Sequence, residues 1–128
     1  MEKMSMSFED YLEAIVMLGG TTEKSVRSVD IANELGVSKA SVSKAIATLK
    51  TRGLVDQPFY GDVTLTAGGY EYGNSVLERH ELLTYFLKDV LGIEAQVAEE
   101  EACKMEHAIG DESFEKWKAY IKKISEEK

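Results

Sequence analysis

The fold of the first half of the chain is decided by residues 28–52, which read SVDIANELGVSKASVSKAIATLKTR. Apolar residues recur there at helical spacing on both sides of Gly36, a residue type that favours the left-handed end of a helix. The pattern predicts one helix over Ser28–Leu35, capped by its own first residue, and a second over Lys39–Arg52, capped by Ser38. Two helices joined by a tight glycine turn are typical of a helix-turn-helix.

The outward face of the second predicted helix is small, polar or basic, as contacts with DNA grooves and phosphates require. Between Lys24 and Arg52 there are six basic residues and two acidic ones, a basic island in a chain of net charge −8. This charge alone also fits a solvated helix face. The candidate DNA-binding residues are Arg27, Ser38, Lys39, Ser41, Ser43, Lys44 and Lys50.

The residues on either side of this pair extend it to a winged helix-turn-helix. A helix is predicted over Phe8–Leu18, with Ser7 as its N-cap. After the pair, two strands at 54–57 and 63–66 flank a turn at 58–62, which is the pattern of a wing. That turn contains no Lys or Arg, so we expect DNA affinity to depend on the basic island.

The second half of the chain is predicted to be entirely helical. A long helix runs over Ala67–Leu91 with Thr66 as its cap, another over Glu94–Ile109, and a last one is capped by Asp111. The apolar stripes of the first and last of these helices comprise Tyr72, Val76, Leu83, Phe86, Leu87 and Val90, and Phe114, Trp117, Tyr120, Ile121 and Ile124.

We therefore expect a mainly α protein with a winged helix-turn-helix DNA-binding domain at 1–66 and a helical metal-binding and dimerisation domain at 67–128. A helical module of about 60 residues is small for an independent core, which favours burial against a second copy, a homodimer.

A possible metal site lies in the second half. Cys103, Glu106 and His107 are spaced i, i+3 and i+4, which puts thiolate, carboxylate and imidazole on one helix face. Read alone, Cys103 also fits a small buried apolar residue. Asp10 and Glu13 share a face of the first helix, where charges that complement the helix dipole are a second interpretation.

Composition restricts the class of protein. The 128 residues contain one cysteine and no apolar run near the ~20 residues of a membrane span, and no signal peptide precedes the first helix. These features favour a cytoplasmic protein without an internal disulfide, and they exclude a tetra-cysteine zinc site within one chain. A His-Glu-x-x-His run, a glycine-rich phosphate loop and a Gly-x-Ser-x-Gly elbow are all missing, so no enzyme is expected.

Several segments together resemble the DtxR/MntR family of metal-dependent transcriptional repressors, in order and over nearly the whole chain. They are residues 8–15, 30–38, 41–44 and 52–55, then Leu65-Thr66 with Gly69, then 79–83 and 103–107. The resemblance implies the two-domain form without the SH3-like third domain. It also implies a dimeric repressor that binds a palindromic operator and controls iron or manganese homeostasis.

The resemblance also implies a set of metal ligands. Asp10, Glu13, His80, Glu106 and His107 match the ligands of the manganese-responsive branch of the family. Cys103 resembles the iron-responsive branch instead, so the set is a hybrid. The implied metal is Mn(II) or Fe(II), with Co(II) or Zn(II) possible in vitro. Such a metal would join the DNA-binding module to the dimer module and so set the separation of the two recognition helices.

Two other functions are compatible with the sequence. A winged-helix dimer could sense an organic ligand or the oxidation of Cys103, in which case it would bind DNA without metal. A winged helix that has lost DNA binding could serve as a protein-interaction module, which would fit the wing without Lys or Arg and the net charge of −8.

Overall fold

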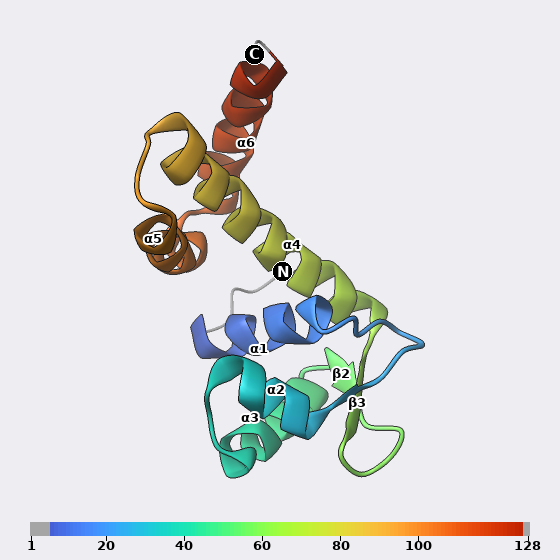
Figure 1. Cartoon of the computed structure of the whole chain (residues 1–128). Coiled ribbons are helices and arrows are strands. Elements are labelled where there is room, and N and C mark those ends of the chain that lie inside the picture. The colour runs from blue at the N-terminus through green and yellow to red at the C-terminus, as the bar shows by residue number, and fades with distance from the viewer. Residues whose placement is uncertain (1–5, 127–128) are drawn as a thin grey trace. The chain divides into compact units, whose positions relative to one another are not determined.

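The computed structural model describes residues 6–126, and their side chains from Phe8 onward (Figure 1). The described residues form two compact units that divide between Leu77 and Glu78, inside helix α4. The predicted domain boundary after residue 66 stays a prediction. Among the described residues, no helix combines the length and apolar character that crossing a membrane requires.

The first unit is a winged helix-turn-helix, which confirms the predicted fold class. Its elements are α1 (Met6–Met17), β1 (Val26–Arg27), α2 (Ser28–Leu35), α3 (Lys39–Thr51), β2 (Val55–Asp56), β3 (Asp62–Leu65) and the first part of α4 (Ala67–Tyr85). The strands form an antiparallel sheet in the order β1-β3-β2, with Val26 opposite Val63 and Val55 opposite Leu65. Strand β1 was not predicted, because two residues are too short to show an alternating pattern.

The helix-turn-helix forms largely as its sequence predicts. Gly36 has a φ of 65°, and the Ser38 hydroxyl accepts a hydrogen bond from the Ser41 backbone N–H at 3.1 Å. The inward positions of α3 are buried: Val42, Ala45, Ile46 and Leu49. The predicted cap of α2 is wrong, because Arg27 occupies the cap position and no side chain caps this helix. The Ser28 backbone N–H instead donates to the carbonyl of Gly61 at 2.8 Å, so the wing holds this helix end.

Helix α1 packs closely against α4 within the first unit. It begins at Met6, so Ser7 lies inside the helix rather than before it, and the Ser7 side chain lies outside the described part. A Cβ atom on Gly73 of α4 would lie 3.0 Å from the carbonyl oxygen of Leu12, and one on Gly69 only 1.8 Å from that of Leu54. These two glycines therefore permit an approach of helix and backbone that any side chain would prevent. The predicted cap of α4 is confirmed, because the Thr66 hydroxyl accepts from the Gly69 N–H at 3.0 Å.

The second unit consists of the end of α4, the π-helical turn η1 (Phe86–Val90), α5 (Ala95–Ala108) and α6 (Asp111–Glu126). The predicted helix over 67–91 is thus α-helical only to Tyr85. Its small core contains Leu83, Leu87, Ala98 and Ala102. Phe86 and Trp117 pack against this core, and the centroids of their rings lie 5.3 Å apart.

Two residues predicted to lie on apolar stripes of this unit are exposed, namely Val90 and Tyr120. Val90 is the last residue of the π-turn, and the wider winding of this turn moves its side chain off the α-helical stripe. The predicted cap of α6 is also wrong. Asp111 is the first residue of that helix, and its carboxylate forms an ion pair with Arg79.

Candidate metal centre

Glu106 is the centre of a buried polar cluster in the second unit. Its carboxylate has no exposed surface. Its Oε2 lies 3.1 Å from Nδ1 of His80 on α4, and its Oε1 lies 3.3 Å from Nε2 of His107, the next residue on α5. Among the described residues, neither oxygen of Glu106 accepts a hydrogen bond. The imidazoles therefore lie close to the carboxylate without forming a hydrogen bond to it.

Each of these two distances matches the spacing of a pair of ligands that share a cation. Two ligand atoms bound at ~2.1 Å and at right angles lie about 3 Å apart. A carboxylate oxygen and an unprotonated imidazole nitrogen are both electron-pair donors, so at this distance they repel each other unless a positive charge lies between them. A buried carboxylate without such a partner costs several kcal/mol. The donors of this cluster thus fit a divalent metal ion.

Cys103 joins this cluster from one turn earlier on α5. It is partly buried, and the ligand atoms of Cys103, Glu106 and His107 all lie within 4.8 Å of one another. The thiolate is softer than the carboxylate and the imidazole, so it shifts the preference of such a set toward Fe(II), Co(II) or Zn(II). Glu99 lies at the edge of the cluster, where its exposed carboxylate is 3.7 Å from Nε2 of His80.

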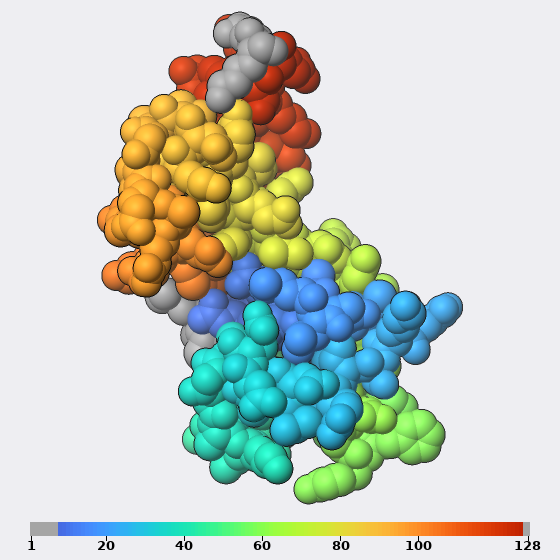
Figure 2. Space-filling view, viewed as in Figure 1, coloured from blue at the N-terminus to red at the C-terminus, as the bar shows by residue number. Residues whose placement is uncertain are grey.

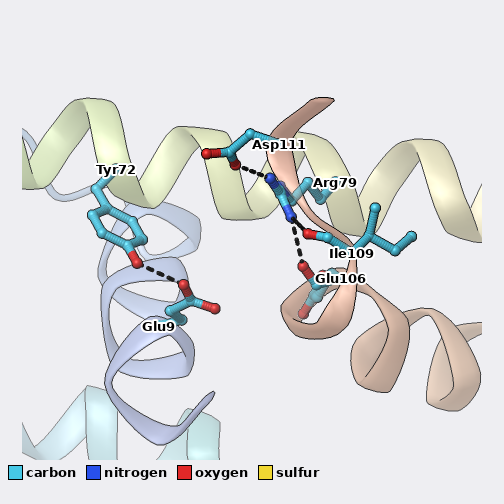
Figure 3. A network of polar contacts seen from close by, with 6 residues as sticks. All are labelled: Glu9, Tyr72, Arg79, Glu106, Ile109 and Asp111. Atoms are coloured by element: carbon cyan, nitrogen blue, oxygen red, sulfur yellow. Dashed lines mark hydrogen bonds and ion pairs between the residues drawn. The ribbon is translucent and has the colours of Figure 1, made fainter. Parts of the chain in front are cut away.

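The two remaining candidate ligands lie on α1, in the first unit. Asp10 is half-buried and Glu13 is buried, one helical turn apart. The neighbouring Glu9 is buried too, and it accepts a 2.6 Å hydrogen bond from the Tyr72 hydroxyl of α4 (Figure 3). This bond ties α1 to α4 beside the two candidate ligands. Burial also raises the pKa of Tyr11 on the same helix.

The sequence alone did not predict the polar contacts that Glu9, Tyr72 and Arg79 make beside the candidate ligands. Tyr72 was assigned to an apolar stripe, which conceals the role of its hydroxyl. For Arg79 a signal was present, because it falls on the buried face of α4 between Val76 and Leu83. A charged residue at a core position indicates a specific partner.

The candidate DNA-binding residues all lie in the first unit with exposed side chains: Arg27, Ser38, Lys39, Ser41, Ser43, Lys44 and Lys50. The Ser38 hydroxyl is partly engaged, since it caps α3 and also donates to the Ser41 hydroxyl at 3.0 Å. The wing loop between β2 and β3 protrudes from the surface (Figure 2), and its tip presents the exposed rings of Phe59 and Tyr60. This unit thus exposes a basic helix beside an aromatic wing that carries no Lys or Arg.

Comparisons with known proteins place both halves of the chain. Residues 3–63 match the N-terminal DNA binding domain of iron dependent repressors. Residues 66–127 match the metal binding and dimerisation domain of the same repressors.

Similar proteins extend over most of the chain. An uncharacterized HTH-type transcriptional regulator of Methanocaldococcus jannaschii is 33% identical over 96% of this chain and 98% of its own length. The transcriptional regulator MntR of Escherichia coli is 34% identical over 90% of this chain and 73% of its own. A solved manganese-dependent transcriptional repressor in complex with manganese has a TM-score of 0.77 and 32% identity over 89% of this chain. This chain spans about half, 52%, of the length of that solved chain.

Proposed function

Since the chain belongs to the family of iron-dependent repressors, we propose that it is a metal-activated, DNA-binding transcriptional regulator that represses genes of iron or manganese homeostasis. The proposal includes a homodimer that binds a palindromic operator in the cytoplasm. It also assigns DNA binding to residues 1–66, and metal binding and dimerisation to residues 67–128. The relatives carry descriptions as transcriptional regulators, which favours a regulator over an enzyme.

The observation that carries the proposal is the environment of Glu106. A fully buried carboxylate stands 3.1 and 3.3 Å from two imidazole nitrogens and accepts no hydrogen bond among the described residues. With neutral imidazoles, such an arrangement costs free energy in a purely structural core, because the buried carboxylate then has no counter-charge. The same arrangement is favourable when Glu106 is the ligand of a cation.

The proposed ligands are Asp10, Glu13, His80, Cys103, Glu106 and His107. A bound divalent ion supplies positive charge and fixed coordination directions at this point. The carboxylates and imidazoles suit Mn(II) and Fe(II), whereas the thiolate of Cys103 favours iron over manganese. Co(II) and Zn(II) are expected to substitute in vitro.

In the proposed mechanism, Asp10 and Glu13 of the DNA-binding domain share ligation with Cys103, Glu106 and His107 of the dimerisation domain. Sharing of ligands would restrict the orientation of each DNA-binding domain relative to the dimer. Half-sites on one face of duplex DNA recur roughly every 34–36 Å, so a fixed separation of the two α3 helices raises affinity for the operator. Without the shared ion, the three carboxylates repel one another and a broader range of orientations is populated.

The first step of the test is to find the DNA sequence that the protein prefers. Duplexes are selected from a random library with the protein and about 1 mM Mn(II), which saturates even weak metal sites. Anaerobic DNA binding is then titrated with Mn(II), Fe(II), Co(II) and Zn(II), with a chelator as control. We expect about a 100-fold gain in DNA affinity with the activating metal, which is near the upper end of the usual coupling between sites. Equal affinity in chelator would contradict the proposal. DNA release on mild peroxide together with metal-independent binding would indicate a thiol sensor at Cys103 instead.

A further inference from the structure

We propose that Arg79 is a positioning residue for the metal ligands, which holds the end of α5 in the place where the Glu106 carboxylate faces His80. This inference rests on the proposed function, because it gives Arg79 a purpose only if those residues bind a metal. It concerns the second unit alone, since Arg79 and all of its partners lie between Glu78 and Glu126.

The main contact of Arg79 is with the last carbonyl groups of α5. Its guanidinium Nη1 donates to the backbone oxygen of Glu106 at 3.1 Å and to that of Ile109 at 2.5 Å (Figure 3). The final carbonyls of a helix have no partners within the helix, and a cation suits this negative end of the helix dipole. Arg79 therefore caps the helix that supplies the ligands.

The other side of the guanidinium is fixed by α6. Nη2 forms an ion pair with the Asp111 carboxylate, and the guanidinium carbon lies 4.9 Å from the centre of the Phe114 ring. Asp111 balances the charge of Arg79, so the guanidinium has no need of the Glu106 carboxylate. That carboxylate stays available to a metal ion even though a buried cation binds the same residue.

Arg79 and His80 are neighbours on α4, and both reach Glu106. Arg79 binds its backbone carbonyl, while His80 lies 3.1 Å from its carboxylate. The register between α4 and α5 is thus set at the residue whose side chain must face the imidazole. Ligands generally need placement within about 0.5 Å, and groups that orient them typically contribute 10- to 100-fold in metal affinity.

A merely structural arginine would make a different prediction. A buried arginine that only joined α4, α5 and α6 would lower the melting temperature when replaced, but each folded molecule would bind metal as before. Metal affinity of the folded protein therefore separates the two roles.

The test is a titration of the full-length, metal-free protein with Co(II), in which the ligand-field absorption of the bound Co(II) is measured. The temperature is one at which circular dichroism shows that every variant is folded. We expect Arg79→Gln to weaken Co(II) binding about 10- to 100-fold and to change the band intensity. Arg79→Lys should recover only part of the loss, because an ammonium group cannot form the planar fork.

The matched control is Lys118→Ala. It removes a 3.0 Å ion pair between Lys118 of α6 and Glu78 of α4, two helices that Arg79 also links, without touching α5. We expect Co(II) affinity and spectrum to stay as in the native protein.

Native affinity and spectrum in folded Arg79→Gln would overturn the inference while leaving the proposed function intact. If that variant does not fold, Asp111→Asn replaces it, with an expected loss of about three- to tenfold because the guanidinium is less firmly held. Unchanged Co(II) binding in Asp111→Asn would then overturn the inference. Failure of the native protein to bind Co(II) or any other of the four metals would remove the proposed function itself.

Discussion

Helices α3 and α5 have almost the same length, 13 and 14 residues. The candidate DNA-binding side chains of α3 lie on its exposed face, whereas Glu106 and His107 of α5 lie on its buried face. Helix α3 buries only apolar residues and exposes its lysines and serines. Helix α5 exposes Glu99, Glu100 and Glu101 and buries Glu106 and His107. DNA is too large to enter a protein and must be met at the surface, whereas a metal ion is most strongly held where water is excluded.

The buried stripe of α5 includes a charged residue, which lowers the stability of the core. Ala98, Ala102 and Glu106 follow one another at intervals of four residues, so the carboxylate occupies the third position of a core stripe. Local patterning and function agree in α3 and conflict in α5. Such conflicts concentrate at functional sites, where stability is given up for binding.

The largest expected effect is on the free energy of unfolding, when a buried residue of α3 and a buried residue of α5 are each replaced. Leu49→Ala in α3 removes a fully buried apolar side chain and should lower the free energy of unfolding by about 2–5 kcal/mol. Glu106→Met in α5 replaces a buried charge with an apolar side chain and should leave the metal-free protein equally stable or more stable, by up to ~4 kcal/mol. Urea unfolding in chelator measures both, and marked destabilisation by Glu106→Met would break the comparison.

The next prediction concerns the replacement of a candidate metal ligand by a side chain of the same shape. Glu106→Gln should lower metal-dependent DNA binding about 100-fold, because the amide cannot supply the negative charge a metal ligand needs. The variant should remain a folded dimer by light scattering. Glu100→Gln on the exposed face of the same helix is the control and should bind DNA as the native protein does. Retained metal response in Glu106→Gln would remove this residue from the ligand set.

Substitution of the thiolate tests the hybrid character of the site. Cys103→Glu should shift the ratio of Mn(II) to Co(II) affinity about tenfold toward manganese, because a hard oxygen ligand replaces sulfur. Competition titrations of the two metals give this ratio. An unchanged ratio would show that Cys103 does not select the metal, and Cys103→Ala separates loss of the thiolate from gain of a carboxylate.

The smallest expected effect concerns the DNA surface. Lys44→Ala on α3 should weaken DNA binding about three- to tenfold at every sequence and reduce the slope of log affinity against log salt by about 1. Tyr60→Ala on the wing is the matched control, because it removes an exposed side chain without charge and should leave the salt slope unchanged. Equal slopes for native protein and Lys44→Ala would show that Lys44 does not contact phosphate.

Much of this molecule could be predicted from local pattern. The inward face of α3, the left-handed Gly36, the caps Ser38 and Thr66 and the two strands of the wing all depend on residues within a few positions of one another. Nearest-neighbour sterics and helical periodicity determine such features.

Other features could not be predicted in this way. Strand β1 exists because Val26 pairs with Val63, and the start of α2 is held by the carbonyl of Gly61. The π-turn that follows α4 was not predicted either, because the helical pattern continues through it, and it contains the exposed Val90.

The sequence by itself determined the class of the fold, the helix-turn-helix and the residue types able to bind a metal, because these follow from spacing along single helices. Only the tertiary structure decided that Glu106 is fully buried between two imidazoles and that Arg79 binds the end of α5. His80 and Glu106 are 26 positions apart in the sequence, and no local periodicity specifies how helices so separated meet. Their contact is set by the packing of α4 against α5, where a buried charge must find its partners or destabilise the core.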